Sequence, residues 1–216
     1  MNTPPQFVEV TPGGIWTLRQ DDSIRCEILK KGRLNWDDTF AELPELDGRR
    51  GIALDIGAFI GDTTPWFNQR GFETLAFEPY PDAFLCLQHN IGSDCHCLAL
   101  GNGERFALQT VEAGNLGARW LAGGEGGCAT VAIDELELKD VAVIKLDVEG
   151  FEPKVLAGAA DTLRRCRPVV IVEFNLSALA RNGFGAADIE RHFQGWSGRE
   201  IYRYDEQQWD VIYSPV

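Results

Sequence analysis

The chain has 216 residues, of which 44% are hydrophobic and 25% are charged, which are proportions typical of a globular protein with one domain and a small appendage. Its 33 acidic residues outnumber its 20 basic residues, and the net charge of −13 argues against binding to nucleic acid or to an anionic membrane surface. No run of 18 uncharged apolar residues occurs, so the sequence predicts no transmembrane helix.

The N-terminus and the cysteines indicate the compartment. The first ten residues, MNTPPQFVEV, contain neither a basic region nor an apolar core, so no secretory signal is expected. Six cysteines are present without a C-x-x-C pair. In a strand, Cys95 and Cys97 would share one face and His96 the other, which favours buried side chains over a metal site. We therefore expect a cytoplasmic protein with free thiols and no bound metal.

Residues 1–48 are predicted to form an appendage that precedes the main domain, 49–216. Ile24, Cys26 and Ile28 alternate with charged residues, as in a half-buried strand. This strand is expected to pair with residues 15–19, which gives a hairpin over residues 13–30. A short helix is predicted from Trp36 to Leu43.

From residue 51 onward, short apolar runs alternate with amphipathic segments. Helical spacing is found over residues 82–91 and 153–165. The runs at 201–204 and 209–213 are separated by a four-residue turn, which predicts a final antiparallel hairpin. The alternation predicts an α/β fold around a mostly parallel sheet; the apolar runs are 52–54, 75–77, 97–100, 141–146 and 169–172.

Ligands of such sheets bind outside the carboxyl ends of the strands, so the first loop, residues 55–65, is a candidate site. Gly57 and Gly61 allow a tight turn and a close approach of the backbone to a ligand. Thr63 or Thr64 is expected to cap the following helix. The G-x-x-x-G spacing differs from the dinucleotide fingerprint, and a tight turn without a ligand would use the same residues.

Acidic residues follow three further runs. Glu78 lies 21 residues beyond Gly57, at the tip of the second strand, where a carboxylate can accept hydrogen bonds from a ribose diol; a surface glutamate is the alternative. Asp147 and Glu149 follow the fourth run and Glu173 follows the fifth. These three carboxylates are expected to converge, although Glu149 is also placed to cap the next helix.

Several segments resemble the FkbM-type methyltransferases, a family of the class I enzymes that use S-adenosylmethionine. The resemblance covers roughly residues 50–175. Phe59 stands where the family motif has asparagine, so a side-chain hydrogen bond to the cofactor is not expected there. The segments that carry it are DIGAFIGDTT at 55–64, FEPYP at 77–81, HNI at 89–91, LALGN at 98–102, IKLDVEGFEPKVLAGA at 144–159 and the strand 168–173.

The resemblance implies a Rossmann-like sheet of seven strands, six of them parallel. It implies S-adenosylmethionine as the cofactor and methyl transfer to an oxygen, on a sugar or another small hydroxylated molecule. The positions expected to bind the cofactor are Asp55, Gly57, Ala58, Gly61, Asp62, Thr63, Glu78, Pro79, Ala99, Leu100 and Asp147.

Methyl transfer from a sulfonium requires alignment of the acceptor and exclusion of water. The carboxylates of Asp55, Asp62 and Asp147 would favour the positively charged cofactor. None of the three histidines follows a strand, so the predicted catalytic residues are Asp147, Glu149 and Glu173, with a carboxylate as the base. Their oxygens would suit Mg²⁺, but no spacing demands a metal.

Two alternative functions remain at this point. An NAD-dependent oxidoreductase on a doubly wound sheet is disfavoured by the loop spacing and by the terminal hairpin. A non-catalytic module that binds a nucleoside or a protein partner would keep the same pocket.

Overall fold

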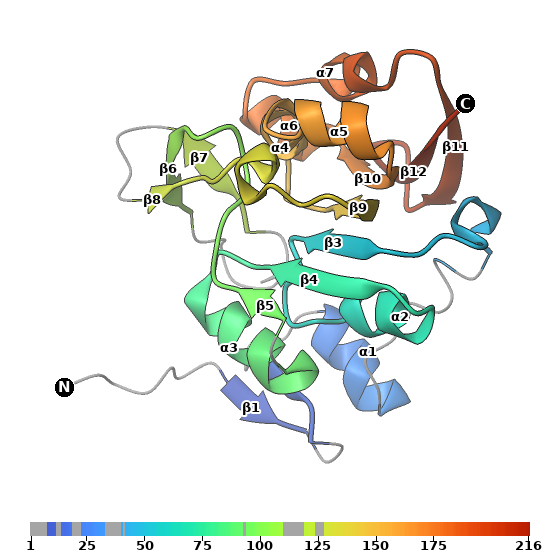
Figure 1. Ribbon diagram of the computed structural model, residues 1–216. Coiled ribbons are helices and arrows are strands. Elements are labelled where there is room, and N and C mark those ends of the chain that lie inside the picture. Colours follow the sequence, from blue (N-terminus) through green and yellow to red (C-terminus); the bar gives the residue numbers. More distant parts are fainter. Residues whose placement is uncertain are drawn as a thin grey trace.

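The computed structural model describes residues 8–11, 14–18, 23–32, 40, 42–92, 94–109, 119–123 and 128–216. A seven-stranded sheet lies at its centre (Figure 1). The strand order is β5-β4-β3-β9-β10-β12-β11. The bounds are β3 Ile52–Ile56, β4 Glu73–Phe77, β5 Cys95–His96, β9 Val141–Leu146, β10 Val169–Asn175, β11 Trp196–Arg203 and β12 Gln208–Pro215.

The direction of the strands confirms the predicted mixed sheet. β5, β4, β3, β9 and β10 pair in parallel. β12 pairs antiparallel with both β10 and β11, so β12 alone runs in the opposite direction in this sheet. The chain passes from β3 outward to β5 and then returns to β9 on the other side, which creates a switch point between β3 and β9. Ligands of open α/β sheets bind at such points.

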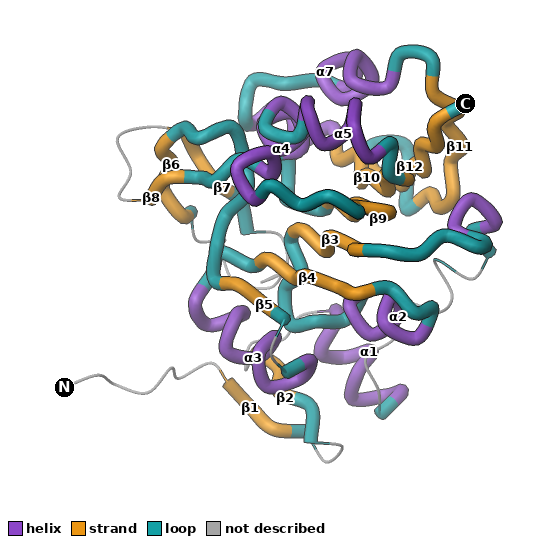
Figure 2. Tube along the Cα trace, in the orientation of Figure 1, coloured by secondary structure: helices purple, strands orange, loops and turns teal. Residues whose placement is uncertain are grey.

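Helices cover both faces of the sheet, as Figures 1 and 2 show. In β9, Ile144 packs on one face with Leu156, while Val143 packs on the other with Trp66. Burial on both faces explains why β9 is an almost uninterrupted apolar run. One layer holds α1 Ser23–Lys31, α2 Thr64–Gln69 and α3 Pro81–Ile91; the other holds α4 Glu152–Ala157, α5 Ala160–Cys166, α6 Leu176–Arg181 and α7 Ala186–Glu190.

Shorter elements complete the described part of the chain. A three-stranded antiparallel sheet, which the sequence patterns did not predict, consists of β6 Arg105–Leu108, β7 Leu121–Gly123 and β8 Cys128–Ala129. Three 3₁₀ turns span Pro44–Leu46, Ile133–Leu136 and Arg191–Phe193. Within the described residues, no helix is both long and apolar enough to cross a membrane.

Two predicted elements differ from the structure. The strand predicted over 97–100 is displaced to Cys95–His96, and Leu100 forms only an isolated bridge with Val131. The helix predicted over 153–165 is divided into α4 and α5 near Gly158. A Cβ atom at Gly158 would lie 1.8 Å from the carbonyl oxygen of Gly101. This close approach of two backbone segments requires glycine and accompanies the interruption.

The N-terminal hairpin was predicted in the wrong place. β1 Val8–Val10 pairs with β2 Trp16–Leu18, and residues 23–31 form the helix α1 instead of a strand. Residues 24 and 28 are four apart, and that spacing places two side chains on one face of a strand or of a helix alike. Ile28 packs with Leu18. The helix predicted from Trp36 to Leu43 lies largely outside the described residues, and the domain division at residue 48 stays a prediction.

Asn90 of α3 connects the hairpin to the main sheet's first loop. Its Oδ1 accepts a hydrogen bond from the Trp16 amide at 2.8 Å, and its Nδ2 donates to the carbonyl oxygens of Trp16 at 3.0 Å and Ile60 at 2.8 Å. The rings of Trp16 and His89 stack with their centroids 4.3 Å apart. The hairpin is therefore docked on α3 by specific contacts.

We expect Asn90→Ala to lower the free energy of unfolding by about 1–3 kcal/mol, because three backbone groups lose their partner. The measurement is urea unfolding. Gln88→Ala, an exposed change on the same helix, serves as the control and should change stability by only a few tenths of a kcal/mol. Equal stability of the two variants would show that Asn90 does not dock the hairpin.

Candidate functional site

The first loop is tied to its own strand by Asp55. This side chain is fully buried. Its Oδ2 accepts a hydrogen bond from the Thr64 hydroxyl at 2.7 Å, and its Oδ1 lies 3.5 Å from the Lys145 ammonium. Thr63 occupies the N-cap position of α2, but neither Thr63 nor Thr64 makes the predicted capping bond; Thr64 reaches Asp55 instead. Asp55 therefore connects the end of β3 to the start of α2 and to β9.

At both glycines of the first loop, an added side chain would collide with neighbouring protein atoms. Gly57 has φ +78°, and a Cβ atom there would lie 1.8 Å from the carbonyl oxygen of Asp147. Gly61 has φ +88°, and its Cβ would lie 2.7 Å from Ile91 of α3. The atoms that require glycine here belong to the loop after β9 and to α3, and the approach of the loop backbone to a ligand stays a prediction.

Glu78 connects the tip of β4 to the first loop. One carboxylate oxygen accepts a hydrogen bond from the Phe59 amide at 3.0 Å, and the other accepts one from the Tyr80 amide at 2.9 Å. The side chain is only 5% exposed. Burial raises the pKa of Glu78 to about 8, although both backbone hydrogen bonds oppose the shift. Each oxygen keeps a lone pair for a further donor, such as a ribose hydroxyl.

Phe59 has the left-handed backbone conformation, with φ +47°. Asparagine and glycine adopt this conformation readily, whereas it is an outlier for a bulky residue. The Phe59 ring is buried against Leu18, Ile28 and Tyr80. Packing against the N-terminal segments therefore accompanies the unfavourable backbone geometry at this position.

The other predicted cofactor positions lie beside these residues. Ala58 is fully buried, and its amide donates to the Phe77 carbonyl oxygen at 3.0 Å. Ala99 and Leu100 are buried in the main core, and Pro79 lies between Glu78 and Tyr80. Asp62 is buried as well. These residues belong to the loops that follow β3, β4 and β5.

Lys145 is a buried charged side chain at this site that was not among the residues predicted from the sequence. Its ammonium lies 3.5 Å from both Asp55 and Asp147 and donates to the Gly57 carbonyl oxygen at 3.2 Å. Burial lowers the pKa of Lys145, but the carboxylates of Asp147, Asp55 and Asp62 outweigh it, so the pKa is raised. The signal in the sequence was a single lysine within the otherwise apolar run VAVIKL, because a buried lysine needs a charged partner.

The structure brings together the three predicted catalytic carboxylates. One oxygen each of Asp147, Glu149 and Glu173 lies within 4.8 Å of the other two. Burial, Asp147 and Glu152 raise the pKa of Glu149 to about 8, and burial together with Asp147 and Glu149 raises that of Glu173. Glu149 does not cap a helix. Glu152 instead accepts hydrogen bonds from the amides of Val148 at 3.1 Å and Gly150 at 3.2 Å.

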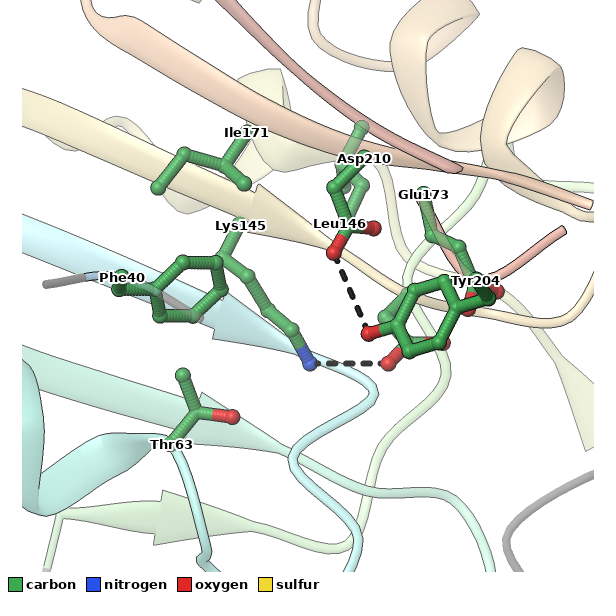
Figure 3. A pocket seen from close by; sticks show the side chains of 9 residues that line it. Phe40, Thr63, Lys145, Leu146, Ile171, Glu173, Tyr204 and Asp210 are labelled. Atoms are coloured by element: carbon green, nitrogen blue, oxygen red, sulfur yellow. Dashed lines mark hydrogen bonds and ion pairs between the residues drawn. The ribbon is translucent and has the colours of Figure 1, made fainter. Parts of the chain in front are cut away.

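A small recess of about 10 Å³, enough for about one water molecule and partly open to solvent, lies next to these carboxylates (Figure 3). Two of its polar side chains come from the terminal hairpin: the Tyr204 hydroxyl lies 3.3 Å from Asp210. Burial raises the pKa of Asp210 to about 7, with Asp147 contributing. The lining residues are Phe40, Thr63, Lys145, Leu146, Asp147, Ile171, Glu173, Tyr204 and Asp210.

None of the three histidines lines this recess, but His96 is the last residue of β5, so the expectation that no histidine lies at the end of a strand is wrong for this residue. His89 belongs to α3, His96 to β5, and His192 to a 3₁₀ turn. His89 contacts the Gly14 carbonyl oxygen at 2.9 Å, and His96 stacks on Phe77.

Residues 128–204 match the family described as the methyltransferase FkbM domain. This segment runs from β8 past β11 and contains all three converging carboxylates. The resemblance to the FkbM-type methyltransferases is confirmed over this segment. No curated protein sequence matches the chain.

One solved structure supports the fold. Methyltransferase FkbM from Methylobacillus flagellatus KT is 16% identical, with a TM-score of 0.50 over 74% of this chain. The aligned region spans only 42% of that protein's chain. At this identity the likeness shows the fold alone, and the fold is the Rossmann-like sheet of class I methyltransferases.

Two weaker likenesses add nothing to that assignment. The PH0226 protein from Pyrococcus horikoshii OT3 is 13% identical, with a TM-score of 0.49 over 88% of this chain and 94% of that chain. A SAM-dependent methyltransferase from Bacteroides fragilis, in complex with S-adenosyl-L-homocysteine, is 13% identical, with a TM-score of 0.42 over 87% of this chain and 82% of that chain.

We expect Gly57→Ala to destabilise the protein by more than the roughly 1–2 kcal/mol that a left-handed alanine costs. The added carbon would meet the Asp147 carbonyl oxygen. Gly71→Ala is the matched control, because Gly71 has φ +83° and no atom within 4 Å of its Cβ position. Urea unfolding measures both variants. A loss at Gly57 no larger than that at Gly71 would contradict the close contact between the two loops.

Proposed function

We propose that the chain is an S-adenosylmethionine-dependent methyltransferase that methylates a hydroxyl group of a small molecule or sugar. The observation that carries the proposal is the arrangement of two different sites on either side of the β3–β9 switch point. Glu78 and the first loop lie on the β4 side, and the carboxylate group of Asp147, Glu149 and Glu173 lies on the β10 side.

The β4 side suits the nucleoside end of the cofactor. Glu78 stands at the strand tip with one lone pair on each oxygen available to the ribose hydroxyls. Asp62 and Asp147 add negative charge that favours the sulfonium and the ammonium of the cofactor's amino-acid end. The match to the FkbM family supports the same cofactor.

The recess beside β9, β10 and β12 suits a hydroxyl group of the acceptor. It is lined by the carboxylates of Asp147, Glu173 and Asp210 and by the phenol of Tyr204. Such groups hydrogen-bond hydroxyls, and Asp147 lies where the two sides meet. The Lys145 ammonium holds this aspartate next to the first loop.

The reaction is a displacement at the methyl carbon. The acceptor oxygen forms the new bond to carbon, the carbon–sulfur bond breaks, and sulfur keeps the electron pair as S-adenosylhomocysteine. The acceptor's proton passes to a carboxylate, Glu149 or Glu173. The pKa of Glu149, raised to about 8 by burial and by Asp147, suits a base that works near neutral pH.

We expect Glu78→Ala to weaken binding of S-adenosylmethionine by about 1–3 kcal/mol, as for the loss of two hydrogen bonds to the ribose. Titration calorimetry measures the affinity. Glu73→Ala removes an exposed glutamate at the other end of the same strand and should bind normally. Unchanged affinity of the Glu78 variant would remove this residue from the site.

Substitution of the carboxylates should separate binding from turnover. Asp147→Asn is expected to reduce both cofactor affinity and turnover. Glu149→Gln and Glu173→Gln should lower turnover by about 10²–10⁴-fold for the residue that acts as the base, with little change in cofactor affinity. The assay follows methyl transfer to a panel of hydroxylated acceptors. Full turnover in both glutamine variants would contradict a carboxylate base.

Two alternative functions are distinguished by ligand titration and by the assay of methyl transfer. The antiparallel β12 between β10 and β11 departs from the all-parallel order of a doubly wound dehydrogenase sheet. Binding of NAD without S-adenosylmethionine would nevertheless restore that alternative. A module without catalysis would bind the cofactor and transfer no methyl group to any acceptor.

A further inference from the structure

Gln208, the first residue of β12, donates a hydrogen bond to one of the predicted catalytic carboxylates. The nitrogen of its side-chain amide lies 2.6 Å from Oε1 of Glu173. Within the described part of the chain, the Glu173 side chain accepts no other hydrogen bond. Because this side chain is only 8% exposed, the Gln208 amide is the polar contact that orients it.

The pairing of β12 with β10 brings the two side chains together. In the antiparallel register, Glu173 lies opposite Asp210, and Asn175 lies opposite Gln208. Residues two apart in a strand share one face of the sheet. Gln208 and Glu173 are therefore diagonal neighbours on one face, at a separation that a long side chain can span.

The turn between β11 and β12 fixes the backbone of Gln208. Its carbonyl oxygen accepts hydrogen bonds from the amides of Tyr204 at 3.0 Å and Asp205 at 3.2 Å. These two bonds close the turn on the residue whose side chain contacts Glu173. The terminal hairpin thus presents the Gln208 amide from a fixed position.

Glu173 lines the recess beside β9, whereas Glu149 does not. Figure 3 shows Glu173 on the same side of this recess as Tyr204 and Asp210. The recess has room for about one water molecule, which is also about the size of a hydroxyl group. Of the two carboxylates considered as the base, Glu173 is therefore the one placed to contact an acceptor's hydroxyl.

The charged groups around Glu173 mostly oppose its ionised form. Burial raises the pKa of Glu173, and so do the carboxylates of Asp147 and Glu149, whereas the hydrogen bond from Gln208 lowers it. The Lys145 ammonium also favours the ionised form. The titratable groups that face Glu173 are Asp147 and Glu149 after β9, Lys145 in β9, Asp210 in β12 and Tyr204 in the turn.

We propose that Gln208 is a positioning residue that orients the Glu173 carboxylate toward the acceptor's hydroxyl. The inference rests on the proposed function and deepens it, because it assigns the contact with the hydroxyl to Glu173. A donor bound to one oxygen restricts the rotation of the carboxylate, and methyl transfer depends on alignment of this kind. Gln208 lies beyond the segment that matches the FkbM family, residues 128–204.

The test is carbon-13 NMR of the full chain, labelled at the carboxyl carbons of its glutamates and titrated with pH. The Glu173 signal is identified by its loss in Glu173→Gln. Gln208→Met keeps the length of the side chain without the donor, and it should raise the pKa of Glu173 by about 1–2 pH units. Gln207→Met is the matched control, because Gln207 is an exposed glutamine in the same turn, and it should leave this pKa unchanged.

A second measurement needs no variant to fold. In the unsubstituted protein, the nitrogen-15 signal of the Gln208 side-chain amide should shift with the same midpoint as the Glu173 carboxyl carbon, because the amide senses the charge of its partner. In the assay of methyl transfer, Gln208→Met should lower kcat by about tenfold or more without a change in KM for S-adenosylmethionine. Gln207→Met should keep full turnover.

Three results would overturn the role of Gln208. They are an equal pKa of Glu173 in both methionine variants, a Gln208 amide signal that does not follow the Glu173 titration, and full turnover in Gln208→Met. S-adenosylhomocysteine affinity, measured by calorimetry on the same samples, separates the two proposals. A protein that binds this ligand but gives one of the three results rejects the positioning role alone. Absence of both binding and turnover in the unsubstituted protein rejects the proposed function, whatever the pKa of Glu173.

Discussion

The buried ammonium of Lys145 holds together the carboxyl edge of the sheet. It pairs with Asp55 beneath the first loop and with Asp147 after β9, and it donates to the Gly57 carbonyl oxygen between them. These contacts join the two strands that border the switch point. Because several carboxylates crowd this edge, removal of the single lysine charge would leave Asp55 buried without a counter-ion, which is strongly unfavourable.

The antiparallel last strand explains why the acceptor side differs from the cofactor side. β12 runs against its neighbours, so its first residues, Gln208 and Asp210, reach the edge where β9 and β10 end. Gln208 holds Glu173, and Asp210 contacts Tyr204. The acceptor side is thus built from ends of parallel strands and the beginning of an antiparallel one, whereas the cofactor side uses only loops that follow parallel strands.

Much of the fold could be predicted from local patterns, because the central strands are apolar runs of the right length. The convergence of Asp147 and Glu173 also followed, since neighbouring parallel strands end at one edge. Asp210 could not be placed in the same way, because its position opposite Glu173 depends on the pairing of two strands that lie far apart in the sequence. The helix over residues 23–31 was predicted as a strand because residues four apart lie on one face in a strand and in a helix alike. The recess beside Lys145 was not predicted because its lining comes from segments that are distant in the sequence.

The side chain of Phe59 packs the first loop against the N-terminal segments. A left-handed backbone with a buried aromatic ring is tolerable only while Leu18, Ile28 and Tyr80 surround that ring. Loss of the hairpin would remove Leu18 from this cover and leave the backbone strain, and asparagine at position 59 would place an amide in an apolar cluster. The side chain at position 59 and the N-terminal cover are therefore energetically coupled, so that a change in one alters the free-energy cost of a change in the other.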